Sequence, residues 1–190
     1  MPIAPHIRLA HPDDAGAIQA IYAPVVSYTS ISFETVAPTV EEMRQRIEKT
    51  LKDFPWLVYE DAGEVLGYAY ASQHRVRAAY QWSVDVSAYI HERMRRQGIG
   101  RKLYTSLFEL LRKQGFYNIY AGITLPNPAS VALHEAMGME AIGVYEKVGY
   151  KTGAWHDVGW WQGLLQSHSV APSPPKKLAD LEITGWEEVV

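Results

Sequence analysis

The stretch that most constrains the fold of this chain is a strand, a glycine turn and a helix in direct succession over residues 83–114. Apolar and polar side chains alternate over residues 83–90, which predicts a strand with one buried face. After Gly98 and Gly100, leucines recur every four residues until Gly115, which predicts an amphipathic helix that ends there. Such a turn gathers free backbone N–H groups at the positive end of a helix dipole, an arrangement that suits a diphosphate.

The residues of this turn are compatible with more than one role. They are Arg95, Arg96, Gln97, Gly98, Ile99, Gly100 and Arg101. The chain has no G-x-x-x-x-G-K-S/T motif, and the turn lacks the third glycine of a dinucleotide-binding fingerprint. Two glycines also suit a plain surface turn with solvated arginines. With its flanking strand and helix, however, the turn resembles the acetyl-CoA signature Gln/Arg-x-x-Gly-x-Gly/Ala of the GNAT superfamily of N-acetyltransferases.

Within that superfamily the chain resembles the phosphinothricin acetyltransferase group over about residues 33–162. The pieces that carry the resemblance are Tyr80-x-Trp82, Tyr89, Leu125-Pro126-Asn127, the run from His134 to Gly138, and the run from Trp155 to Gln162. Two positions stand out. The group is expected to have Glu where this chain has Asp85, and the wider superfamily often has a Tyr at the position of His134.

Composition narrows the class of protein. A chain of 190 residues with 47% hydrophobic content can bury one substantial core, so we expect one domain over residues 1–166 and a proline-containing tail over 167–190. The net charge of -3, without a long basic run, argues against a nucleic-acid partner. No apolar stretch approaches the ~20 residues of a membrane span, and no signal-peptide pattern opens the chain, so we expect a cytoplasmic protein without membrane contact.

The chain contains no cysteine, which excludes a disulfide, a thiol nucleophile and a Cys-type zinc site. His156 and Asp157 are adjacent, but no spaced His pair and no nucleophile-elbow Ser accompany them. We therefore expect no metal, and we interpret these two residues as structural members of a loop.

The remaining pattern predicts short strands and helices in mixed order. Asp13 is expected to cap a helix that ends near Ala23, before Pro24, and Thr39 with Glu42 forms a capping box for a second helix. Other predicted elements are strands at 7–10, 56–60, 65–70, 117–123, 141–148 and 158–164, and a helix that starts after Asn127 and ends before Gly138. This order predicts an α+β (mixed α/β) fold, and the resemblance implies a GNAT-like mixed, mostly antiparallel sheet flanked by helices.

The resemblance also implies which residues hold acetyl-CoA. Backbone amides of Ala88, Tyr89 and Ile90 are expected to bind the pantetheine arm, next to the 95–101 turn. Asn127 and Ser130 are expected to complete the groove, although capping the following helix is an equally good role for Asn127.

Two side chains are candidates for catalysis. Asp85 lies in mid-strand, where a carboxylate needs hydrogen bonds or a task, and we interpret it as a general base that acts directly or through water. A purely structural Asp is the alternative. His134 is interpreted as the proton donor to the departing CoA thiolate or as an orienting group near it, and a half-buried surface histidine is the alternative.

Six further residues are candidates for binding the acceptor. They are Phe33, Glu34, Arg75, Arg77, Tyr80 and Trp82. The arginines suit the carboxylate or phosphinate of an amino-acid-like substrate, and Glu34 suits an amino group. Solvated arginines, a capping role for Glu34 and aromatic side chains in the core or in an interface are the alternatives.

We therefore hypothesise an N-acetyltransferase that uses acetyl-CoA to acylate the α-amino group of a small amino-acid analogue such as phosphinothricin, methionine sulfoximine or methionine sulfone. A GNAT enzyme for a polyamine, an aminoglycoside or a protein N-terminus, and a non-catalytic CoA-binding module, remain alternatives. The resemblance and the aromatic residues favour a homodimer.

Overall fold

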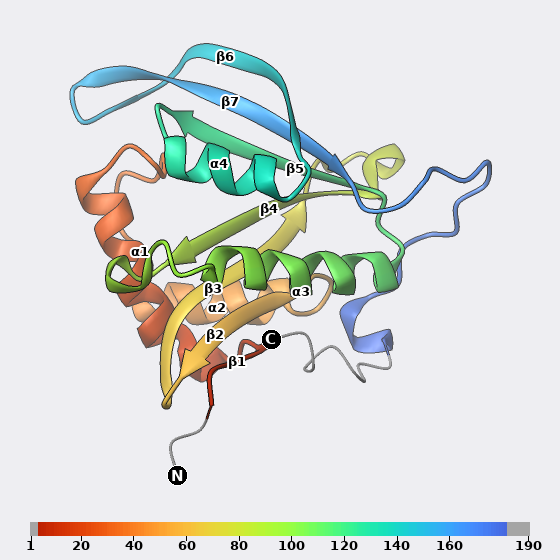
Figure 1. Ribbon diagram of the computed structural model, residues 1–190, viewed down its shortest axis with the longest axis horizontal. Coiled ribbons are helices and arrows are strands. Elements are labelled where there is room, and N and C mark those ends of the chain that lie inside the picture. The colour runs from red at the N-terminus through yellow and green to blue at the C-terminus, as the bar shows by residue number, and fades with distance from the viewer. Residues whose placement is uncertain (1–3, 182–190) are drawn as a thin grey trace.

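The computed structural model describes residues 4–181 and contains one mixed sheet with helices on both faces (Figure 1). Its elements are β1 (His6–Leu9), η1 (Pro12–Asp14), α1 (Ala15–Tyr28), α2 (Val40–Thr50), β2 (Trp56–Asp61), β3 (Glu64–Gln73), η2 (Ala78–Tyr80), β4 (Ser83–Ile90), η3 (Glu92–Met94), α3 (Ile99–Gln114), β5 (Asn118–Leu125), α4 (Pro128–Ala136), β6 (Glu140–Lys151), β7 (Ala154–Leu164) and η4 (Leu178–Asp180). The strand order is β1-β2-β3-β4-β5-β7-β6, and only β4 and β5 run parallel. The predicted α+β fold with a mixed, mostly antiparallel sheet is confirmed.

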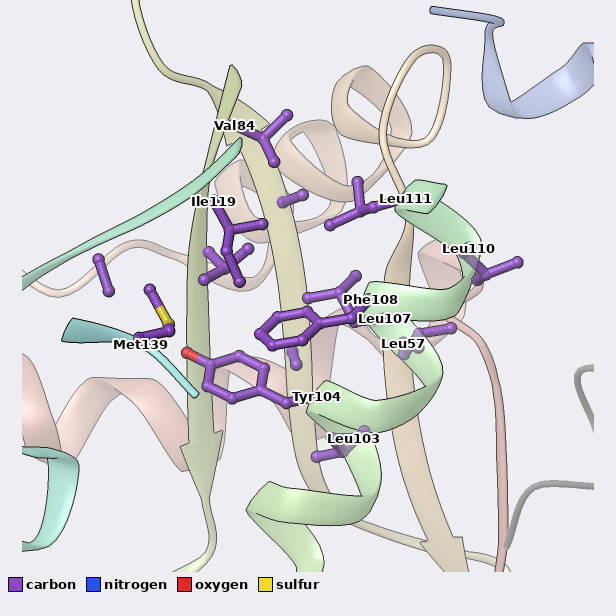
Figure 2. Packing of buried hydrophobic residues seen from close by; sticks show 14 of the residues in the cluster. Leu57, Val84, Leu103, Tyr104, Leu107, Phe108, Leu110, Leu111, Ile119 and Met139 are labelled. Atoms are coloured by element: carbon purple, nitrogen blue, oxygen red, sulfur yellow. The ribbon is translucent and has the colours of Figure 1, made fainter. Parts of the chain in front are cut away.

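The helix that follows the glycine turn supplies the larger core. Its inward side chains Leu103, Tyr104 and Leu107 are fully buried. Figure 2 shows Tyr104 and Phe108 facing Ile119 across the core. Each such side chain contributes about 1.5–3 kcal/mol by burial, so this one helix fixes the position of the turn that precedes it. A second core lies between α1, α2 and the opposite face of β2 and β3.

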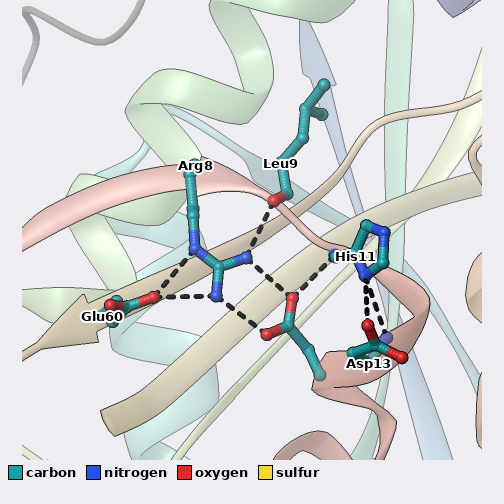
Figure 3. A network of polar contacts seen from close by, with 6 residues as sticks. Arg8, Leu9, His11, Asp13 and Glu60 are labelled. Atoms are coloured by element: carbon teal, nitrogen blue, oxygen red, sulfur yellow. Dashed lines mark hydrogen bonds and ion pairs between the residues drawn. The ribbon is translucent and has the colours of Figure 1, made fainter. Parts of the chain in front are cut away.

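The start of α1 differs from the prediction. His11, rather than Asp13, caps the short η1 turn, since its ring nitrogen accepts the backbone N–H of Asp13. Asp14 accepts two hydrogen bonds from the Arg8 guanidinium, at 2.7 and 2.8 Å. Figure 3 shows the same guanidinium reaching Glu60. This network connects η1 to β1 and β2. The start of α1 is therefore held by the ion pairs of Arg8 rather than by the predicted cap at Asp13.

The predicted end of α1 near Ala23 is also wrong, because the helix continues through Pro24 to Tyr28. A proline inside a helix removes one backbone hydrogen bond. Val25 and Val26 are both buried, Val26 within the second core, and this packing holds the last turn in place.

The β6–β7 hairpin is longer than predicted, because residues 154–157 of the expected loop belong to β7. Thr152 and Gly153 both have positive φ and form a two-residue turn, so that Lys151 pairs directly with Ala154. Asp157 accepts the backbone N–H of Lys147 at 2.7 Å, at an irregularity in β6. His156 donates to the carbonyl of Lys151, so both side chains hold the hairpin together.

The segment after β7 lies on the body of the domain. Ser173 accepts a hydrogen bond from the indole N–H of Trp82, and the Gln114 amide donates to the carbonyl of Lys176. Leu178 is 4% exposed. No helix within residues 4–181 is long and apolar enough to cross a membrane.

Candidate functional site

The site begins where β4 and β5 part. The two strands pair only from Ser83 to Asp85, and that pairing ends at Asp85 and Tyr120. Each strand stays paired with its other neighbour, β4 with β3 and β5 with β7, so the sheet opens only on this side. The opening contains a cavity of about 60 Å³. Its lining includes Val86, Ser87, Ala88, Tyr89, Tyr104, Gly122, Thr124, Asn127, Ser130 and His134.

The glycine turn lies at the N-terminus of α3. Gly98 is the N-cap residue with φ +79°, a left-handed conformation that glycine adopts without strain. It has no side chain to cap the helix, so the first N–H groups of α3 remain available to an anion. Arg95, Arg96 and Gln97 are exposed beside them. These donors and charges suit the diphosphate of a nucleotide-containing ligand.

The two helices that border the first cavity are closely packed. A Cβ placed on Gly100 would lie 3.0 Å from the end of the Leu133 side chain, so the glycine allows α3 and α4 to approach closely. Arg101 reaches the carbonyl of Ala136 at 3.4 Å. Asn127 caps α4 by accepting the backbone N–H of Ser130. The predicted cap is therefore confirmed, and the same residue also lines the cavity.

His134 is buried, and both of its ring nitrogens are engaged. Nδ1 lies 2.7 Å from the backbone oxygen of Ser130, which can only accept, so Nδ1 carries the hydrogen. Nε2 then accepts from the hydroxyl of Tyr104 at 3.0 Å. Burial lowers the pKa of His134 below its ordinary value and raises the pKa of Tyr104. The pair is therefore neutral near neutral pH, and it forms one wall of the cavity.

Asp85 is held by a histidine that the sequence analysis did not consider. The Oδ1 atom of Asp85 lies 2.6 Å from Nδ1 of His74. Burial raises the pKa of the Asp85 carboxyl above its ordinary value, and the hydrogen bond from His74 opposes this shift. The His74 ring stacks on Tyr120, with centroids 4.2 Å apart. The carboxylate therefore has a fixed partner beside the point where the strands part.

A second cavity, of about 240 Å³, lies next to this pair. It is lined by His74, Arg75, Tyr120, Ile142, Gly143, Tyr145 and Trp160. The guanidinium of Arg75 lies 5.8 Å from the centroid of the Trp160 ring. Trp160 also lies against Gly122, which lines the first cavity, since a Cβ on Gly122 would be 3.4 Å from its ring. The two cavities are thus neighbours. The first lies beside α3 and α4, and the second contains the Arg75 guanidinium.

The structure brings only some of the acceptor candidates to these cavities. Arg75 lines the second cavity, and Tyr80 packs edge-on against His74 with ring centroids 6.0 Å apart. Arg77 and Trp82 line neither cavity. The indole N–H of Trp82 instead donates a hydrogen bond to the backbone carbonyl of Ser173.

Two other candidates belong to contacts of their own. Arg46 donates two hydrogen bonds to Glu34, at 2.7 and 2.9 Å, and these lower the pKa of Glu34. Phe33 covers Gly149 on β6. Among the expected cofactor contacts, Ala88 and Tyr89 line the first cavity, whereas Ile90 packs toward Gly67.

Sequence reasoning missed several cavity residues, among them His74, Tyr104, Tyr120 and Trp160. Tyr104 and Tyr120 lie within predicted elements, but aromatic side chains there are typical of a core. His74 lies directly before Arg75, and that adjacency is the signal that could have drawn attention to it.

Comparison with known proteins establishes the family to which the chain belongs. A family model described as an acetyltransferase (GNAT) domain matches residues 7–160. The chain belongs to the GNAT acetyltransferase family. This GNAT chain is 39% identical to a phosphinothricin N-acetyltransferase of Streptomyces viridochromogenes, over 90% of its own length and 91% of the relative's. It is 32% identical to an L-methionine sulfoximine/L-methionine sulfone acetyltransferase of Salmonella typhimurium, over 86% and 96% of the two chains.

Solved structures agree with this assignment. The yncA protein of Salmonella typhimurium, solved with acetyl-CoA, matches the GNAT chain with a TM-score of 0.85 and 32% identity, over 90% and 99% of the two chains. A phosphinothricin acetyltransferase of Sinorhizobium meliloti in complex with acetyl-CoA gives 0.83 and 33%, over 90% and 94%. A ribosomal-protein-alanine N-acetyltransferase of Brucella melitensis gives 0.81 and 35%, over 83% and 98%. The GNAT chain is an acyltransferase.

Proposed function

We propose that this GNAT enzyme transfers the acetyl group of acetyl-CoA to the α-amino group of a small amino-acid analogue of the phosphinothricin or methionine sulfoximine type. The observation that carries the proposal is the pair of neighbouring cavities at the parting of β4 and β5. One is bordered by α3 and α4, and the other contains Arg75. The names of the relatives that act on these two acceptors support the same choice.

The first cavity suits the thioester arm of acetyl-CoA. Beyond Asp85, none of the described strands pairs with β4 on the β5 side. The backbone groups of successive strand residues point to opposite sides, and those of Tyr89 face β3, so the groups of Ala88 and Ile90 can bond the amides of an extended pantetheine chain. We propose that one of these N–H groups stabilises the oxyanion of the attacked carbonyl. The diphosphate would lie on the turn from Arg95 to Gly100, as the exposed donors there suggest.

The second cavity suits an acceptor with a negative group. Arg75 presents a planar set of donors to a carboxylate or phosphinate. A polyamine or an aminoglycoside would meet this cation unfavourably, because like charges repel in a partly buried site. The aromatic rings of Tyr145 and Trp160 offer apolar contact for the remainder of the side chain.

The structure favours an orienting role for His134. Its neutral ring holds the Tyr104 hydroxyl at the wall of the first cavity, where that hydroxyl can turn to the departing sulfur. Direct proton donation by His134 is unfavourable, since burial keeps the ring neutral. We propose that Tyr104 stabilises the leaving thiolate and that His134 positions it.

We further propose that two copies associate through the β6–β7 hairpin. β6 is the edge strand of the sheet, and its apolar side chains are exposed. They are Ile142, Val144, Tyr145, Val148 and Tyr150, each between 50% and 60% exposed. An uncovered apolar edge strand is unfavourable in water, and a second copy covers it by isologous contact. Light scattering after size exclusion should give twice the chain mass for wild type and one chain mass for Val148→Lys.

A thiol-release screen tests the function. Purified protein with acetyl-CoA is offered phosphinothricin, methionine sulfoximine, methionine sulfone, spermidine, an aminoglycoside and a peptide that begins with alanine. We expect release with the first three acceptors. Release with the peptide alone would favour the second candidate, a protein N-terminal acetyltransferase, which the Brucella relative suggests. Binding of acetyl-CoA without release would favour a non-catalytic module.

A further inference from the structure

We infer that His74, held by Asp85, is the group that takes the proton from the acceptor amine. The inference rests on the proposed function and adds to it, since neither the sequence pattern nor the relatives assign a role to His74. Asp85 lines neither of the two cavities, whereas His74 lines the cavity that we assign to the acceptor. The histidine is thus the member of the pair that can meet the substrate.

The hydrogen bond between the two residues fixes the tautomer. An ionised Asp85 can only accept, so Nδ1 of His74 carries the hydrogen of the 2.6 Å contact. The other ring nitrogen, Nε2, then has a free lone pair in the neutral imidazole. Asp85 therefore does for His74 what an orienting carboxylate does in other acid–base pairs: it fixes the ring and stabilises its protonated form.

The ring is also held in place by its surroundings. It stacks on Tyr120 from β5 at 4.2 Å and meets Tyr80 from η2 edge-on. The titratable and charged groups that face it are Asp85, Tyr80, Tyr120 and the neighbouring Arg75. Asp85 is the only one of these four that is negative near neutral pH, so it is the group that stabilises an imidazolium.

The same arrangement accounts for the short carboxylate. An Asp side chain is one methylene shorter than Glu, and here it points to an imidazole rather than into a cavity. The imidazole extends the reach of the carboxylate by the width of one ring. A base at Nε2 thus replaces a longer carboxylate or a bridging water.

In the step that we propose, the acceptor ammonium gives one proton to Nε2 of His74. The freed lone pair attacks the thioester carbonyl carbon, and the C–N bond forms. The nitrogen loses its second proton to water, the C–S bond breaks, and the thiolate is protonated from solvent. His74 then returns its proton to solvent. The products are the N-acetyl compound, CoA thiol and one net proton.

The pH dependence of kcat tests this role. With an acceptor that wild type acetylates, kcat should fall on the acid side. His74→Gln should lower kcat by about 10²-fold or more and remove this acid limb, with acetyl-CoA affinity by calorimetry within about threefold of wild type. The kcat profile of Asp85→Asn should keep an acid limb, displaced to lower pH, because the protonated His74 ring loses the carboxylate that stabilises it.

A matched control is His168→Gln. His168 also stacks on a tyrosine, Tyr117, and bonds a polar side chain, that of Asn118, but it lies outside both cavities. We expect wild-type kcat and an unchanged pH profile. The inference is overturned if His74→Gln keeps the acid limb with kcat within threefold of wild type, or if Asp85→Asn abolishes the limb, since Asp85 itself would then be the base.

Nitrogen NMR of the free wild-type protein separates this inference from the proposed function. We expect the neutral His74 ring to carry its hydrogen on Nδ1, and a hydrogen on Nε2 would overturn the inference whatever the enzyme acetylates. If His74→Gln does not fold, the Asp85→Asn profile and this spectrum still decide. Absence of thiol release by wild type with every acceptor would count against the proposed function instead.

Discussion

Replacing Gly149 by Ala should loosen the contact between the 29–39 loop and the β6–β7 hairpin. A Cβ at Gly149 would lie 2.1 Å from one atom of the Phe33 ring and 2.6 Å from two others, so the ring must leave its place. Because Phe33 is 38% exposed, the lost contact is worth about 1–2 kcal/mol, compared with ~3 kcal/mol for a fully buried ring. For a chain of this size, that corresponds to a fall in Tm of about 2–8 °C.

Thermal unfolding followed by circular dichroism measures this effect, and the same strand supplies a control. Gly143 also lies on β6, and among residues 4–181, apart from Gly143 and its two chain neighbours, no heavy atom lies within 4 Å of the place that a Cβ would take there. Gly143→Ala should therefore leave Tm within about 1 °C of wild type. A fall in Tm for Gly149→Ala no larger than that for Gly143→Ala would refute this reasoning. It would mean that a Cβ at position 149 does not displace the Phe33 ring at a cost in stability.

Three further outcomes are expected. Arg46→Gln should destabilise the protein by about 1 kcal/mol at neutral pH. Because the pKa of Glu34 is lower in the folded protein than its unfolded value of about 4.3, its ion pair with Arg46 stabilises the fold above that pH. The difference in the free energy of unfolding between wild type and Arg46→Gln, measured in urea, should therefore vanish as the pH falls through the folded pKa of Glu34. A difference that persists in acid would contradict this pairing. Tyr104→Phe should lower kcat by about tenfold or more with little change in acetyl-CoA affinity, and unchanged turnover would remove Tyr104 from the mechanism. Arg75→Ala should raise KM for a carboxylate-bearing acceptor by about 10–100-fold, and an equal effect of Arg77→Ala would contradict the assignment of the cavity.

Local signals predicted the elements that border the first cavity. The alternation over Ser83–Ile90 and the leucines of α3 are confirmed within the bounds expected. The capping box at Thr39 and the cap at Asn127 are confirmed as well. All of these depend on residues within a few positions of each other, which is why one sequence suffices to find them.

Contacts between distant segments could not be predicted in this way. His74 meets Asp85 because the register of β3 with β4 pairs Ser72 with Asp85, just before the end of β3. Glu34 meets Arg46 because the 29–39 loop folds back onto α2. Local propensity contains neither fact, and α1 continues through Pro24 for the same reason, since tertiary packing outweighs the lost hydrogen bond.

Calorimetric titration with acetyl-CoA tests the central claim most directly, namely that the opening beside β4 and the turn at Gly98 bind the acyl donor. We predict saturable binding of one acetyl-CoA per chain, and an affinity about tenfold weaker or more for Gly98→Val, whose backbone would be strained at a φ of +79°. No heat of binding at millimolar acetyl-CoA with folded wild-type protein would contradict the account.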